Sequence, residues 1–423
     1  MQISLNLLIS LILTFPHGVG FLIYSNDFGI DKLLTIFILP FLIKIIKINN
    51  KTFFILCLLL ISFSFFQGIN SWIAGIFSKQ SLFFFYDILF ALTFFYSGTY
   101  ISRNKEILIK TLNQIILFSI FFNIIALLLN IFNVDLSLIR PGEQYSIYLT
   151  RGDLGEGALK HYMGFYAASH EASFWFLFYK LIYILRNALK SKYATNLSFL
   201  GNNNFFLIYQ LFFSLLIIFT QTRFLTIITL ILDIFILINY IRKKNQAILL
   251  FIIIIILIPI FIYLVKSSFY YKYLLENVNT LIRFNDLNYD NPYKFNFLAD
   301  KRIIGYTYLL TNNPIDTLIN FGIKPLGPLF YIFKNSTLSI TGLDYNIWDD
   351  LSAYIVYFFA YGFSFFIGFL SIATKVIFSK NKLPKIVPFL IFFSSLQFLT
   401  NNGLYILTFI SAIYINYNDK EIL

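Results

Sequence analysis

Charged residues are scarce in this chain of 423 residues. Asp, Glu, Lys and Arg together make up 12% of it, whereas a soluble globular protein carries about 25%. Hydrophobic residues account for 58% of the chain and aromatic residues for 20%. A chain with so few polar groups cannot cover a folded surface in water, so the composition predicts a polytopic integral membrane protein.

Cysteine and histidine are scarce as well. The single cysteine, Cys57, lies in an apolar run, so one chain can form neither a disulfide nor a cysteine metal cluster. The three histidines show no spacing with carboxylates that resembles a zinc site, and no GxxxxGK[ST] phosphate-binding motif occurs. We therefore expect no metal and no cofactor, and neither a metalloprotease nor an ATP-driven pump.

The net charge of +12 is interpreted as a signal of membrane topology. The basic residues occur in groups of three or four between apolar segments, which is the distribution expected of cytoplasmic loops and not of a nucleic-acid surface. No nucleic-acid partner is expected. The N-terminal segment lacks a basic region and a small-residue cleavage site, so it is interpreted as the first membrane span and not as a signal peptide.

Apolar runs of about 20 residues, the length needed to cross roughly 30 Å of hydrocarbon, recur along the chain. They predict an all-α fold, a single membrane domain over 1–423 with about twelve transmembrane helices. The predicted spans cover 4–24, 30–48, 52–68, 82–101, 107–132, 162–185, 205–220, 224–241, 247–265, 351–373, 386–400 and 404–417.

Lysine and arginine accumulate in every second short loop, which predicts that both termini are cytoplasmic. Two long segments then lie on the outer side, at 133–161 and 266–350. The second is expected to contain short amphipathic helices. Loops of such length are usually functional, so the polar chemistry is expected on this outer side.

The segment IIFTQTRFLTIITL, residues 217–230, sets Arg223 inside an apolar stretch that runs from 205 to 241. As one helix this stretch would be about 55 Å long, too long for one crossing. A turn at ThrGlnThrArg is therefore predicted, with Arg223 at the outer interface, where it either reaches lipid headgroups or binds an anion. Asp233 lies about 15 Å further along the helix and is expected to pair with another helix.

A second polar intrusion, His170–Glu171, lies at the outer half of the predicted span 162–185. Ionisable residues inside a membrane are functional candidates by default. Glu171 is therefore a candidate proton donor or acceptor and His170 its companion. The alternative is a structural salt bridge to Arg223 or to another helix.

The outer segments carry several arginines, whose planar guanidinium binds two phosphate oxygens at once. With few acids and no metal ligands around them, they suit an anionic lipid-linked substrate. Transport and group transfer both remain open on this physics alone. The candidate diphosphate-binding residues are Arg140, Arg151, Arg223, Arg283 and Arg302, and the candidate acceptor-side residues of the second long segment are Asn346, Asp349 and Asp350.

Four motifs, in this order along the chain, resemble the Wzy-type O-antigen polymerases and, more distantly, the O-antigen ligase superfamily. ThrGlnThrArg at 220–223 resembles the family's Ser/Thr–x–Ser/Thr–Arg hairpin, and HisGluAlaSerPhe at 170–174 resembles its Glu-Pro-Ser-Phe-like motif. The other two lie in the second long segment and comprise Arg302 with Gly305, Asn313–Pro314 and Gly322, and Tyr345–Asn346 through Tyr354.

Two features depart from the family pattern. Tyr345 stands where ligases and many relatives carry a histidine, and the paired arginine–glycine motifs occur only loosely, at Arg140 and at Arg151–Gly152. A histidine base at the first place is therefore not expected.

The resemblance implies a metal-independent glycosyltransferase in the bacterial cytoplasmic membrane. Such an enzyme moves a growing glycan from undecaprenyl diphosphate onto a lipid-linked repeat unit at the outer face. Membrane lipids and a chain-length regulator protein are the other implied partners. A flippase for lipid-linked oligosaccharides and an O-antigen ligase are the alternatives.

Overall fold

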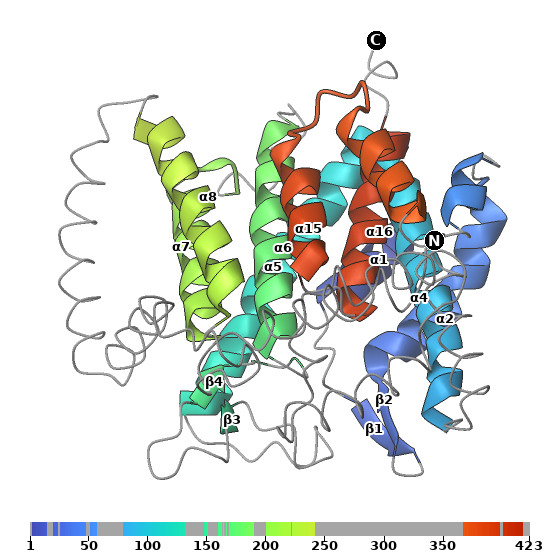
Figure 1. Ribbon diagram of the computed structural model, residues 1–423, viewed down its shortest axis with the longest axis horizontal. Coiled ribbons are helices and arrows are strands. Elements are labelled where there is room, and N and C mark those ends of the chain that lie inside the picture. Colours follow the sequence, from blue (N-terminus) through green and yellow to red (C-terminus); the bar gives the residue numbers. More distant parts are fainter. Residues whose placement is uncertain are drawn as a thin grey trace, which may run out of the picture.

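The computed structural model describes a helical bundle with two short β-hairpins (Figure 1). The all-α prediction is confirmed for the bundle, and the hairpins are the exception to it. The described residues are 2–14, 20–23, 26–47, 51–56, 79–131, 148–150, 160–162, 164, 166, 169–189, 200–220, 222–241, 367–397 and 401–417.

The labelled helices follow the apolar runs of the sequence. Their bounds are α1 Gln2–Thr14, α2 Ile30–Ile45, α4 Lys79–Ser102, α5 Lys105–Ile131, α6 Ser169–Ala188, α7 Asn203–Phe219, α8 Arg223–Ile241, α15 Ile386–Gln397 and α16 Asn401–Asn416. A further apolar helix covers Ile367–Ile377. Two antiparallel hairpins are formed by β1 Gly20–Ile23 with β2 Asn26–Gly29, and by β3 Tyr148–Thr150 with β4 Lys160–Tyr162.

Two predicted spans are wrong at one end. The run 4–24 is helical only as far as Thr14, and its last residues belong to β1. Pro16 and Gly18 explain why the apolar run does not remain one helix, since neither residue suits a helix interior.

The run 162–185 likewise begins as strand β4, and α6 starts only at Ser169. Gly164 between them has a left-handed φ of 57°, which an α-helix does not contain.

One helix among the described residues is long and apolar enough to cross a membrane, by length and composition, and it covers Lys105–Leu129. The other apolar helices there are shorter. The predicted span 247–265 lies outside the described residues, as do most of 52–68 and of 351–373.

Helix α6 is the central helix of the bundle. Every residue from 172 to 183 is buried, including Trp175, Tyr179 and Tyr183. It packs against α5, α7, α8, α15 and α16. The Tyr179 hydroxyl donates to the carbonyl of Leu13 at 3.2 Å, which ties α6 to α1. A helix covered on all sides in this way can hold polar groups away from both water and lipid.

Among the described helices, the most extensive contact joins α4 to α16. It depends on Gly98, because a Cβ atom there would lie 2.5 Å from the carbonyl oxygen of Phe409 and 2.8 Å from the Cβ of Ala412. Phe90 and Phe94 pack on the ring of Tyr405 in the same contact, with centroids 5.8 and 5.4 Å apart. Small residues that allow two backbones to approach closely are typical of helix contacts in membranes.

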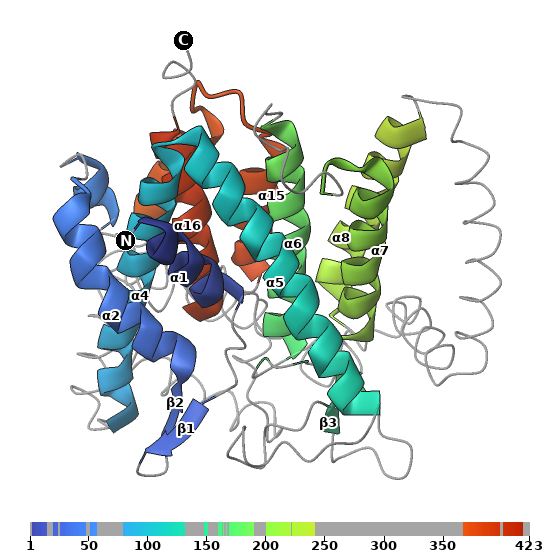
Figure 2. The ribbon, with the colours of Figure 1, turned by 180° about the vertical axis from the view of Figure 1, so that it is seen from behind.

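The two ends of the bundle are formed by different segments of the chain (Figures 1 and 2). The hairpin end is defined by both β-hairpins, the start of α6 and the α7–α8 turn; β4 packs against α7 there. The basic end is defined by the end of α2 through Lys47, the α4–α5 turn, the segment 378–385 and the last turn of α16.

Several hydrogen bonds join the segments of the basic end. Arg103 donates to the carbonyls of Ile45 at 3.5 Å and Lys47 at 3.3 Å, and Asn381 donates to the carbonyl of Tyr414 at 2.6 Å. The two predicted cytoplasmic loops that contain Lys47 and Arg103 therefore contact each other at this end of the bundle.

Candidate functional site

The chain reverses direction between α7 and α8, as the sequence predicts. Helix α7 ends at Phe219 and α8 begins at Arg223. The backbone N–H of Thr220 closes the end of α7 by donating to the carbonyls of Leu216 and Ile217, both at 3.1 Å. The N–H of Thr226 then donates to the carbonyl of Thr222 at 2.9 Å and opens α8. Arg223 is thus the first residue of a helix at the hairpin end, and not a residue in the middle of one.

The start of α6 lies directly beside this turn. The hydroxyl of Ser173 donates to the hydroxyl oxygen of Thr222 at 2.7 Å, and both side chains are buried. The hydroxyl of Thr220 also bonds Thr222, at 3.1 Å. Because Glu171 is two residues from Ser173 and Arg223 follows Thr222, the two polar intrusions of the sequence meet at one place.

The electrostatics of this part of the bundle favour the binding of an anion. Helices α6 and α8 both begin here, and a helix N-terminus carries a partial positive charge. Glu171 lies in the first turn of α6, where that charge stabilises a carboxylate. Arg223 adds a full positive charge at the start of α8. An anionic group arriving at the start of α8 would meet the partial positive charge of the helix N-terminus, in the same turn that carries Arg223.

Three of the predicted site residues lie in described elements. His170 and Glu171 belong to the first turn of α6, with the side chain of Glu171 partly buried, and Arg223 starts α8. The remaining predicted residues lie outside the described residues and stay predictions: Arg140, Arg151, Arg283, Arg302, Asn346, Asp349 and Asp350.

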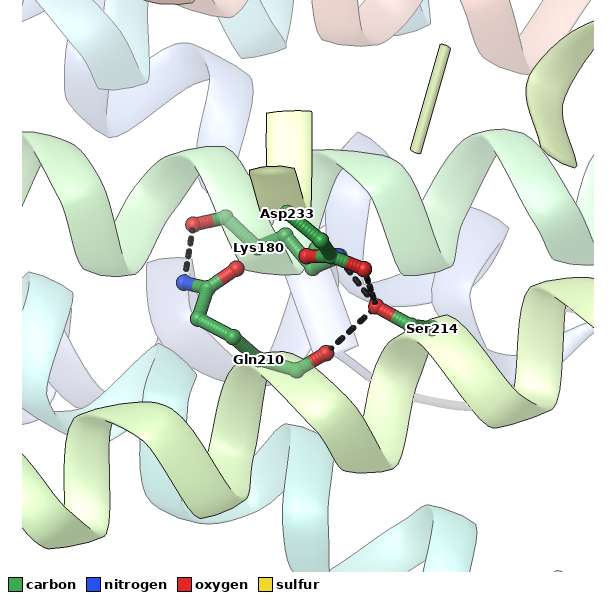
Figure 3. Close-up of polar contacts among 4 residues, drawn as sticks. All are labelled: Lys180, Gln210, Ser214 and Asp233. Atoms are coloured by element: carbon green, nitrogen blue, oxygen red, sulfur yellow. Dashed lines mark hydrogen bonds and ion pairs between the residues drawn. The ribbon is translucent and has the colours of Figure 1, made fainter. Parts of the chain in front are cut away.

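A buried polar network lies deeper in the bundle, between α6, α7 and α8 (Figure 3). The ammonium of Lys180, which is fully buried, pairs with Asp233 at 2.5 Å. Ser214 of α7 lies between them: it accepts from the ammonium of Lys180 and donates to the other carboxylate oxygen of Asp233 at 2.5 Å. Gln210 completes the network by donating to the carbonyl of Lys180 at 3.1 Å.

The expectation that Asp233 pairs with another helix is confirmed, and Lys180 is the partner that sequence reasoning missed. A usable signal existed. Lys180 lies nine residues after Glu171, and Asp233 lies ten residues after Arg223. Two opposite charges at the same depth, each in an apolar helix, are expected to pair because an isolated charge there is costly.

Among the residues that the structure describes, no group of three or more His, Cys, Asp or Glu is placed to hold a metal ion.

Comparison with protein-family models, with curated proteins and with solved structures found no match for this chain. The resemblance to O-antigen polymerases accordingly remains a prediction drawn from four short motifs. The geometry bears on two of these motifs, since it brings residues 170–174 and 220–223 together at the hairpin end.

Proposed function

We propose that this protein is a polysaccharide polymerase of the bacterial cytoplasmic membrane. It transfers a growing glycan from undecaprenyl diphosphate onto the terminal sugar of another lipid-linked repeat unit. The chain crosses the membrane about twelve times with both termini in the cytoplasm, and the hairpin end faces outward. A chain-length regulator protein is a further proposed partner.

One observation carries this proposal: the Ser173–Thr222 hydrogen bond at 2.7 Å. It joins the two polar intrusions of the sequence, one with a carboxylate and one with an arginine. Glycosyl transfer from a diphosphate needs these two charges, since one group must accept the hydroxyl proton and another must stabilise the leaving diphosphate. A lipid-headgroup contact by Arg223 alone would give no reason for the hydrogen bond that joins its turn to the segment carrying Glu171.

The reaction follows from these roles. The oxygen of the acceptor hydroxyl attacks the anomeric carbon, and its proton passes to the carboxylate of Glu171. The bond from the anomeric carbon to the diphosphate oxygen breaks, and the electron pair leaves with the diphosphate. Arg223 and the N-terminus of α8 stabilise the developing negative charge, an effect worth roughly 10²–10³ in rate per donor. Arg302, Arg283 and one of Arg140 or Arg151 are the proposed further cations.

A flippase is the second candidate, and the Lys180–Asp233 pair favours it, because charges inside membrane helices often mark transport pathways. This pair, however, is satisfied within the protein: Ser214 bonds both partners, and Lys180 has no exposed surface. A substrate would have to break the network to use it. Polymerisation therefore remains the better-supported function.

Deletion of the gene in its native host distinguishes the candidates. A polymerase mutant should display surface glycan capped with one repeat unit, because export and ligation continue without chain growth. Loss of a flippase or a ligase should instead remove repeat units from the surface. Complete absence of repeat units in the deletion strain, restored by the intact gene, would overturn the proposal.

A further inference from the structure

Helices α6 and α8 are parallel neighbours joined at two depths. At the hairpin end Ser173 bonds Thr222 at 2.7 Å, and deeper in the bundle Lys180 pairs with Asp233 at 2.5 Å. Ser173 precedes Lys180 in the chain, and Thr222 likewise precedes Asp233, so the two helices run in the same direction. Two fixed points between a pair of parallel helices restrict sliding as well as rotation.

The deeper joint is built across three helices. Ser214 comes from α7, the antiparallel helix between the other two in sequence, and it bonds Lys180 and Asp233 simultaneously. Its hydroxyl is also held 2.8 Å from the carbonyl of Gln210 in its own helix. Figure 3 shows the side chains of Lys180, Ser214 and Asp233 meeting at one point, with the Gln210 amide directed at the backbone carbonyl of Lys180. Helix α6 packs more extensively on α7 than on α8, and this network joins α6 directly to α8.

The joint is also rigid for a physical reason. The side chain of Lys180 has no exposed surface and that of Asp233 is 13% exposed. Separating the two charges would leave the fully buried ammonium of Lys180 unpaired in surroundings of low dielectric constant, which is strongly unfavourable. Glu171 lies about 14 Å from Lys180 along α6, and Arg223 lies about 15 Å from Asp233 along α8.

We propose that the Lys180–Asp233 pair, held by Ser214, is a positioning element for the transfer reaction: it sets the register at which Glu171 and Arg223 meet one substrate. This inference rests on the proposed function. Neither residue contacts the substrate, so both act through the helix starts. The pair should therefore affect turnover more than substrate affinity.

The first readout is a cross-link that does not depend on activity. Cys57 is replaced by serine, and Ser173→Cys with Thr222→Cys are introduced where the two hydroxyls now touch. Oxidation of native membranes should then form a disulfide rapidly. In Lys180→Met or Asp233→Asn we expect the cross-linking rate to fall about tenfold, because an uncompensated charge disrupts the joint.

The second readout is catalysis, measured with lipid-linked repeat units on the same variants without the added cysteines. We expect kcat per inserted molecule to fall about tenfold while KM stays within about threefold. The charge reversal Lys180→Asp with Asp233→Lys should recover at least half of the cross-linking and turnover, since Ser214 can bond either arrangement. Such a rescue is not expected of residues that matter only for insertion.

The apolar pair Lys180→Met with Asp233→Leu covers the case in which the single variants fail to insert. It leaves no unpaired charge, so it should insert, yet it lacks the directional joint and should cross-link more slowly than wild type. Wild-type cross-linking and kcat in this double variant would overturn the inference. If wild-type membranes elongate no glycan at all, the proposed function fails, and the cross-linking series still decides whether the pair sets the register.

Discussion

Two helix contacts in this bundle are built in opposite ways. The α4–α16 contact brings backbones together at Gly98 and is filled by aromatic rings. The contact among α6, α7 and α8 is joined by an ion pair and by hydroxyls at two depths. Close packing stabilises a contact without needing charge. The second contact leads to the start of α6 and to the α7–α8 turn, so it is the one we associate with function.

The largest effect that separates the two contacts should come from Glu171→Gln. Loss of the proton acceptor is expected to slow polymerisation about 10²-fold or more at unchanged protein level. The matched control is Glu106→Gln, because Glu106 is also an acid in the first turn of a helix but is exposed at the basic end. Glycan chain length in cells and turnover in membranes measure both. Equal effects of the two variants would contradict a special role for the hairpin end.

Gly98→Leu should reveal the opposite behaviour at the α4–α16 contact. Its side chain has to displace Phe409 and Ala412, and overpacking of this kind costs about 1–3 kcal/mol of stability. We expect a lower unfolding temperature in detergent, and nearly normal turnover per molecule that remains folded. Gly201→Ala serves as the control, because nothing lies within 4 Å of a Cβ atom there. A fall in turnover without a fall in stability would contradict the division between the two contacts.

Thr222→Val should have a smaller effect. It removes the acceptor of the Ser173 hydroxyl and keeps nearly the same shape, so it costs about 1 kcal/mol or roughly fivefold in turnover. Thr374→Val is the comparison, since the Thr374 hydroxyl bonds only carbonyls of its own helix in an exposed position. Turnover of purified protein distinguishes them. The contact at the α7–α8 turn would be unimportant if both variants matched wild type.

Arg103→Ala should have the smallest effect. Its side chain is exposed at the basic end and donates only two long hydrogen bonds, at 3.5 and 3.3 Å. Surface contacts of this kind contribute little, so turnover and inserted protein should both stay within about twofold of wild type. Quantitative immunoblotting of membranes with a chain-length assay checks this. A severe loss of polymer would place part of the site at the basic end.

Much of the bundle could be predicted from hydrophobicity, because long apolar runs have few alternatives to helix. The bounds of α4, α5, α7 and α8 lie within three residues of the predicted spans. The reversal before Arg223 was predictable for a related reason, since a single helix would have been too long.

The failures have a different origin. The early end of α1 and the late start of α6 depend on single residues such as Pro16 and Gly164. Hydrophobicity averaged over about 20 residues does not detect the effect of one such residue on the backbone. Position 98 needs glycine because of a helix more than 300 residues away in sequence. The residues around Gly98 in the sequence do not indicate this contact.

The site was predictable as a set of residue types and not as an arrangement. Arg223 and Glu171 were singled out because charges are costly in apolar segments. Their proximity depends on the Ser173–Thr222 hydrogen bond, which joins residues 49 positions apart. Equal depth in two apolar helices makes Lys180 a candidate partner of Asp233, but only the structure shows that the two helices are neighbours.

The most direct test of the account is the glycan chain-length distribution made by Arg223→Ala and Arg223→Lys at matched levels of inserted protein. We expect Arg223→Ala to leave single repeat units on the surface. Arg223→Lys should retain short chains, because it keeps the charge and loses the two-oxygen contact with the diphosphate. A wild-type distribution from a stably inserted Arg223→Ala protein would contradict the assignment of the hairpin end as the site of polymerisation.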